Sequence, residues 1–144
     1  MENLKSNHGH SHDIAGLEGN LASIAPVAWM IILGDGLHNF IDGLSIGAAF
    51  TQSILQGINI CIAVACEEFP HELGDFAILV HAGMSYRQAL FYNFLSACMC
   101  FLGLVLGIYI GDSMNKWIYA LAAGMFIYIG LSQMVIKFYL NLLD

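Results

Sequence analysis

The sequence predicts an all-α protein, a polytopic membrane helix bundle of about four transmembrane helices. The chain has 144 residues, of which 58% are hydrophobic and only 10% charged, and its mean hydropathy is +0.71. Soluble domains carry about 25% charged residues, so this composition is typical of a membrane protein. The apolar residues also gather into stretches that reach the roughly 20 residues a helix needs to cross a bilayer. The lipid bilayer is therefore the expected environment of the chain.

These apolar stretches divide the chain into predicted helices and tails. They cover residues 21–50, 53–82, 86–111 and 117–137. Trp117 begins the last stretch, where an interfacial aromatic residue is expected. We expect residues 21–137 to form one four-helix transmembrane domain because the connections between the stretches are short. Residues 1–20 form a polar tail without the apolar core of a signal peptide, and residues 138–144 form a tail too short to cross again.

The few cationic residues indicate an orientation. With the N-terminus in the cytoplasm, Lys5, Arg87 and Lys137 lie on the cytoplasmic side and Lys116 on the other. Cytoplasmic loops are enriched in Lys and Arg, so three against one favours this topology.

Three histidines alternate in the N-terminal tail, at His8, His10 and His12. Alternating histidines in a tail can hold a metal ion loosely. A polar tail is equally well interpreted as a linker, and the two interpretations stay open.

Cysteines and glycines in the apolar stretches are interpreted as packing residues. The cysteines are Cys61, Cys66, Cys98 and Cys100, which form no Cys-x-x-Cys pair. Buried cysteines usually behave as small apolar residues, so neither disulfides nor a zinc site is expected; Cys66, beside a polar segment, is the one exception left open.

Glycines recur every four residues in two of the stretches, at Gly103, Gly107 and Gly111 and at Gly43 and Gly47. This spacing places the glycines of each set on one ridge of a helix. Such ridges of small residues let membrane helices approach closely, so we assign them to helix packing.

Polar belts interrupt the first two stretches, at residues 34–43 and 66–75. Charge inside a membrane helix is costly and persists where something compensates it, and a bound cation does so economically. Residues three or four apart share a helix face. The polar side chains that share a face, or adjoin it, are His38, Asn39 and Asp42 in the first belt and Glu67, Glu68 and His71 in the second. Nitrogen and oxygen donors of these kinds suit zinc, ferrous iron and manganese.

Pro70 lies inside the second belt, beside the candidate ligands. A proline within a helix removes one backbone hydrogen bond, which a membrane helix tolerates where protein, water or an ion satisfies the freed carbonyl. Asp75, one turn after His71, is a candidate to orient the His71 imidazole, whereas Glu72 points to another face and is a candidate to bind an ion or proton elsewhere.

Two other interpretations of the belts are weighed against a metal site. Intramembrane polar residues often hydrogen-bond between helices and hold a bundle together, but six such groups at ligand spacing favour ion handling. The run His71-Glu72-x-x-Asp75 has the outline of a zinc-protease helix whose second histidine is replaced, so intramembrane proteolysis is the weaker alternative. The formal net charge of -7 makes nucleic acid a poor partner.

The two belts resemble a known family. The segments His38-Asn39-Phe40-Ile41-Asp42-Gly43 and Glu67-Glu68-Phe69-Pro70-His71-Glu72-Leu73-Gly74-Asp75 are similar to the paired fourth and fifth transmembrane helices of the ZIP (Zrt/Irt-like protein) metal-ion transporters, of the LIV-1 subfamily. The resemblance covers about residues 8–131 and includes residues 82–85, 93–97 and 122–128. Glutamate at Glu67, where most of the subfamily has histidine, resembles the branch that moves iron, manganese and cadmium as well as zinc.

The resemblance implies a binuclear transport site between two helices. Matched position by position, one metal is held by His38, Asp42, Glu67 and His71, and the other by Asn39, Asp42, Glu68 and His71. The family has eight transmembrane helices, so the resemblance also implies that this chain corresponds to the C-terminal half, without the first three helices and the last.

We therefore expect a non-enzymatic protein that carries divalent metal ions into the cytosol, as a fragment or truncated isoform of such a transporter. Zinc is the favoured cargo, with iron, manganese and cadmium as further ones. The expected location is the plasma membrane or an endosomal or lysosomal membrane. Self-association or association with an intact homologue stays open, and so does the alternative of a metal-binding partner subunit that transports nothing.

Overall fold

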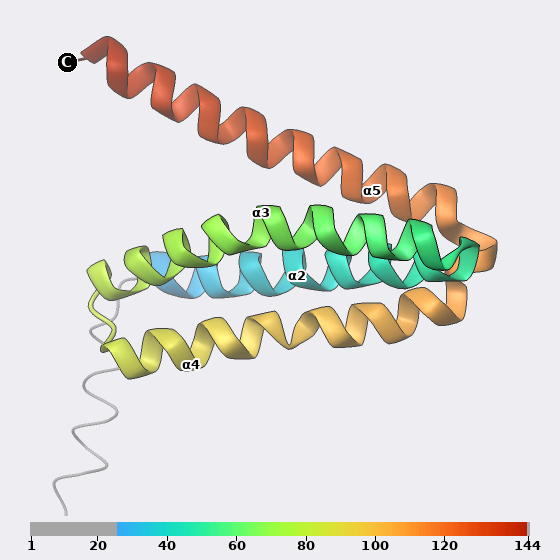
Figure 1. Ribbon diagram of the computed structural model, residues 1–144. Helices are drawn as coiled ribbons and strands as arrows, with labels where there is room; N and C mark the ends of the chain where they lie inside the picture. Colours follow the sequence, from blue (N-terminus) through green and yellow to red (C-terminus); the bar gives the residue numbers. More distant parts are fainter. Residues whose placement is uncertain (1–25, 144) are drawn as a thin grey trace, which may run out of the picture.

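The computed structural model describes the backbone of residues 26–143 and the side chains of residues 26–132. It has four helices, α2 (Pro26–Gln52), α3 (Ile54–His81), α4 (Tyr86–Ala97) and α5 (Met99–Leu143), and no strand within the described residues. Figure 1 shows α2, α3 and α4 lying side by side. The predicted all-α fold is confirmed. His8, His10 and His12 in the predicted tail lie outside the described residues, as do the side chains of residues 133–144.

The observed helices follow the predicted stretches with two differences. α2 and α3 correspond to the first and second stretches, but the third is divided at Cys98, between α4 and α5. The predicted connection at residues 112–116 is itself helical, because α5 continues through it.

The chain nevertheless reverses direction within α5. Gly103 and Gly111 lie against Phe40 and Ala48, so this part of α5 runs parallel to α2. After the reversal Ile118 packs against Ala48, and Phe126 lies 5.8 Å from His38 between ring centroids. The chain therefore passes α2 twice, in opposite directions, as the turn of the orange ribbon in Figure 1 shows.

Short capped connections fix how α3 and α4 begin. Ser53 caps α3 by accepting a hydrogen bond from the Gln56 amide at 3.1 Å. Ser85 and Gln88 form a capping box at the start of α4, which satisfies two amides that a helix N-terminus leaves unpaired. Gly83, with φ at 102°, makes the turn before it, since side chains disfavour that backbone region.

Glycines bring α2 and α5 into backbone contact. A Cβ added at Gly43 would lie 1.9 Å from the carbonyl oxygen of Cys100, and one at Gly103 would lie 1.9 Å from that of Phe40. The same crowding recurs one turn on, at Gly47 and Gly107. The prediction that these glycines serve helix packing is confirmed, because any larger residue would force the two backbones apart.

The outside of the helices is largely apolar. Large side chains such as Phe94, Phe101, Tyr109 and Trp117 are mostly exposed, which is typical of lipid-facing surface. Among the described residues, the stretch Tyr86–Ser132 is long and apolar enough to cross a membrane. α2 and α3 carry the polar belts, which lower their hydropathy and lie toward the interior.

Candidate metal site between α2 and α3

One face of α2 supplies three buried polar side chains to the interior. His38, Asn39 and Asp42 are only 3%, 5% and 2% exposed, respectively. They share a face because they are spaced by three and four residues, and the glycine contact with α5 holds that part of α2 in place. Three polar groups buried this completely need partners or a ligand.

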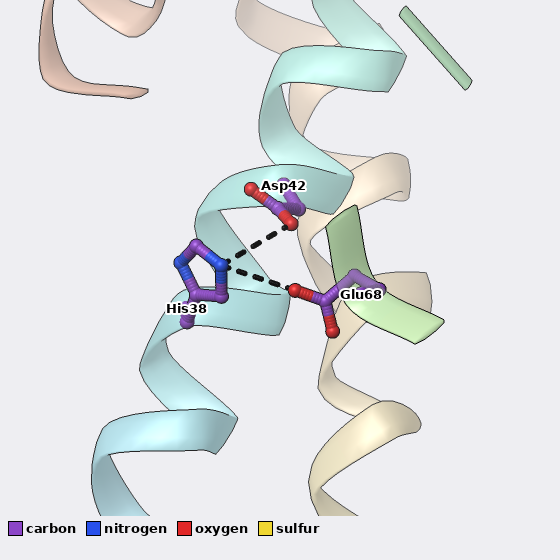
Figure 2. Close-up of side chains that lie close together, drawn as sticks. All are labelled: His38, Asp42 and Glu68. Carbon is purple, nitrogen blue, oxygen red and sulfur yellow. Dashed lines mark ion pairs between the residues drawn. The ribbon is translucent and has the colours of Figure 1, made fainter. Parts of the chain in front are cut away.

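Glu68 of α3 completes the cluster from the facing helix. His38 Nε2 lies 3.0 Å from Glu68 Oε1 and 3.8 Å from Asp42 Oδ2. Figure 2 shows the imidazole edge turned toward both carboxylates. One ligand atom from each of the three residues lies within 4.8 Å of the others, which is close enough for a single cation to reach all three.

Several atoms of this cluster have no hydrogen-bond partner among the described residues. They are both ring nitrogens of His38, Oδ2 of Asp42 and both carboxylate oxygens of Glu68. His38 Nε2 and Glu68 Oε1 are at ion-pair distance but do not have hydrogen-bond geometry. An unpaired buried polar group costs about 1–3 kcal/mol, and more if charged, so this donor set suits a divalent cation with nitrogen and oxygen ligands.

His71 lies beside this cluster and between two cavities. Its ring centroid is 5.6 Å from that of His38. It lines a cavity of ≈ 490 Å³ with His38 and Asp75, and a second cavity of ≈ 220 Å³ with Glu67 and Pro70. Glu67 is therefore near His71 but is not part of the tight cluster around His38. No hydrogen bond joins Asp75 to His71 among the described residues, so the predicted orienting role of Asp75 is not seen.

A second group of carboxylates adjoins the first through Glu68. Ligand atoms of Asp35, Glu68 and Glu72 lie within 4.8 Å of one another. α4 contacts this group, because Ser96 Oγ donates a hydrogen bond to Asp35 and Asn93 Nδ2 donates one to Glu72. Glu72 thus contacts α4, but its carboxylate also lies beside that of Glu68, one turn earlier on α3, so the prediction that Glu72 points away from the candidate ligands is not confirmed.

Asn39 belongs to this second group by its hydrogen bonds. Its Nδ2 donates to Asp35 Oδ1 at 2.9 Å and to the Asp35 carbonyl oxygen at 3.2 Å. Asp35, 6% exposed, is a buried carboxylate for which the sequence predicted no role. Its spacing held the signal, because Asp35, Asn39 and Asp42 recur at four and three residues on one face of α2.

Buried imidazole and carboxylate groups between helices with a largely apolar outside are typical of a membrane protein that handles ions. A family model described as "ZIP Zinc transporter" matches residues 2–139. The chain belongs to this family, which is one of integral membrane transporters and not of enzymes. The zinc-protease interpretation of His71-Glu72-x-x-Asp75 accordingly has no support left.

Curated relatives agree with the family. The metal cation symporter ZIP14 of Xenopus tropicalis is 64% identical over 114 residues, which are 78% of this chain and 25% of that protein. ZIP14 of Bos taurus is 55% identical over 135 residues, 93% of this chain and 27% of that protein. The human metal cation symporter ZIP8 is 61% identical over 115 residues, 79% of this chain and 25% of that protein. The chain thus spans about a quarter of the length of these relatives, and no solved structure matches it.

Proposed function

We propose that this chain takes part in moving divalent metal ions across a membrane into the cytosol, and that His38, Asn39, Asp42, Glu67, Glu68 and His71 bind the ion on its way. One observation carries the proposal: α2 and α3 bring His38, Asp42 and Glu68 together with buried ligand atoms that no protein group satisfies. Membership in a family of zinc transporters supports a divalent metal ion as the species that binds there.

Charge favours a cation at this place. Four carboxylates, from Asp35, Asp42, Glu68 and Glu72, belong to the two clusters that share Glu68. Like charges inside a membrane protein repel strongly because little solvent screens them, and a divalent cation offsets that repulsion. The half-buried carboxylate of Glu67 adds a further oxygen ligand beside His71.

We propose zinc as the main cargo, with iron, manganese and cadmium as further ones. The donors are imidazole nitrogen, carboxylate oxygen and amide oxygen, without a thiolate in the proposed ligand set, and such a set accepts several divalent ions of the first transition row. Relatives whose printed name is metal cation symporter, rather than zinc transporter, support a broad cargo. The plasma membrane or an endosomal or lysosomal membrane is the proposed location.

Binding and transport need separate tests, since the curated relatives are several times longer than this chain. The whole chain is placed in lipid nanodiscs, and zinc affinity and stoichiometry are measured for the wild type, His71→Ala and the matched control His81→Ala. His81 is an exposed histidine at the end of the same helix. We expect His71→Ala to lose most of the bound zinc and His81→Ala to keep it. Wild-type stoichiometry in His71→Ala would contradict the proposed site.

Transport is then measured as zinc uptake by vesicles that contain this chain alone or together with a full-length homologue. Uptake by the chain alone supports transport by these helices themselves. Zinc binding without uptake in either vesicle would reject transport and leave the alternative of a metal-binding partner subunit. Competition by iron, manganese and cadmium for zinc uptake ranks the cargo ions.

A further inference from the structure

We propose that Ser96 and Asp35 are positioning residues that hold the Asn39 amide in the orientation needed for metal binding. The inference deepens the proposed function and rests on Asn39 acting there as a ligand. An asparagine can bind a cation only through its amide oxygen, since the amide nitrogen carries two protons and no available lone pair. Whatever decides which branch of the amide faces the cation therefore decides whether Asn39 can bind it.

Asp35, one turn earlier on α2, sets the orientation of the Asn39 amide. Nδ2 of Asn39 donates two hydrogen bonds to Asp35, one to the carboxylate at 2.9 Å and one to the backbone carbonyl at 3.2 Å. The nitrogen and oxygen branches of a planar amide diverge, so the oxygen is turned away from Asp35. Among the described residues, none donates a hydrogen bond to that oxygen. A flipped amide would place its oxygen against the oxygens of Asp35, which is repulsive.

Ser96 of α4 holds Asp35 from the other side. The hydroxyl of Ser96 donates to Asp35 Oδ2, while the other carboxylate oxygen accepts from Asn39. Ser96 Oγ also lies 3.0 Å from the carbonyl oxygen of Asn93, but a hydroxyl has one proton, and a carboxylate is the stronger acceptor. Both partners are deeply buried, at 4% exposure for Ser96 and 6% for Asp35, so water does not compete for this link.

The hydrogen bonds that link Ser96, Asp35 and Asn39 thus give α4 a role in the site, although none of the proposed ligands lies on α4. Groups that hydrogen-bond to metal ligands fix the orientation of those ligands, and their loss typically weakens metal binding about 10–100-fold. Ser96 is a more specific residue to test than Asp35, because replacing Ser96 leaves every carboxylate in place. A change at Asp35 would also alter the charge felt by the cation.

The experiment is a double-mutant cycle on the whole chain in nanodiscs. Affinity for Zn²⁺ and the visible absorption of bound Co²⁺ are measured for the wild type, Ser96→Ala, Asn39→Ala and the double variant. We expect Ser96→Ala to raise the zinc Kd about 10-fold and to change the Co²⁺ spectrum in the same direction as Asn39→Ala. In the Asn39→Ala background, Ser96→Ala should add almost nothing.

Two further variants keep the outcome decisive. Ser96→Thr retains the hydroxyl and should restore zinc affinity, and Ser113→Ala, at an exposed serine on α5, should leave it unchanged. Equal losses from Ser96→Ala with and without Asn39 would show a general packing role and overturn the inference, as would an unchanged Kd. Failure of the wild type to bind zinc would instead reject the proposed function itself.

Discussion

Neutralising Glu68 separates the two effects that its charge has on this protein. Glu68 belongs to both clusters, one with His38 and Asp42 and the other with Asp35 and Glu72. Without a cation, its carboxylate repels those of its neighbours. With a cation, the same carboxylate attracts the ion. Glu68→Gln keeps the size of the side chain, so it should raise the stability of the metal-free chain and lower the stabilisation that metal adds.

The size of the repulsion follows from the geometry. Ligand atoms within each cluster lie no more than 4.8 Å apart, so two ionised carboxylates repel by at least about 3.5 kcal/mol at an effective dielectric constant of about 20. The attraction between Glu68 and a protonated His38 at 3.0 Å is about 5.5 kcal/mol on the same scale. Three carboxylate neighbours outweigh one imidazole, and we expect metal-free Glu68→Gln to melt at a higher temperature than the wild type.

Metal should narrow that difference. Zinc at 100 times its wild-type Kd stabilises the folded chain by about 2.7 kcal/mol. Loss of one partner of a buried charge pair costs about 2–5 kcal/mol. A 100-fold weaker Kd, at the lower part of that range, leaves only about 0.4 kcal/mol of stabilisation at the same zinc concentration. The zinc-induced rise in Tm should therefore nearly vanish.

The assay is thermal unfolding of the whole chain in nanodiscs, with and without zinc. Asp112→Asn is the matched control, because Asp112 is an exposed carboxylate on α5 near Gly111, far along α2 from the clusters. It should behave as the wild type in both conditions. If Glu68→Gln kept the full zinc-induced rise in Tm, Glu68 would not bind the ion.

Three further outcomes follow from the packing. Gly103→Ala places a Cβ against the Phe40 carbonyl and should lower Tm by several degrees, the effect of a strained contact of about 1–3 kcal/mol, whereas Gly74→Ala, which meets nothing within 4 Å, should not lower it. The four cysteines are free, so a thiol count on the denatured, unreduced chain should give four, and a lower count would show a disulfide. Zinc should slow amide hydrogen exchange more in α3 than in the part of α2 that contacts α5, and equal protection of both would contradict binding between α2 and α3.

The sequence predicted most of the helical segments and the polar residues that share one face of α2. The polar side chains of His38, Asn39 and Asp42 stand out against an apolar stretch, and the helical period alone places them together. The pairing of α2 with α3 around His38 and Glu68 required the resemblance to a family, because spacing within one helix says nothing about which helix it faces. The metal-ligand roles themselves stay predictions.

What the sequence could not predict was the contribution of α4 and the helical continuity of α5. Ser96 and Asn93 look like ordinary polar residues in a helix, and only the packed structure brings their donors to Asp35 and Glu72. The polar segment 112–116 predicted a connection where the chain reverses, but this segment has no proline and keeps helical hydrogen bonding, so α5 continues through it. Its position is set by tertiary contacts with α2.

The two helices that carry the proposed site differ in how many of their residues are buried. α2 has thirteen buried residues and is held by backbone contact with α5 through glycine, whereas α3 buries only Gly57, Val64 and Leu79. The proposed ligands on α2 are thus held by packing without an ion, while Glu68 and His71 lie on a helix that buries few apolar residues of its own. Since carboxylates on the two helices repel each other, the cation itself supplies much of the attraction between them. In the proposed site, binding of the ion would draw α3 onto α2, and release of the ion would weaken that contact again.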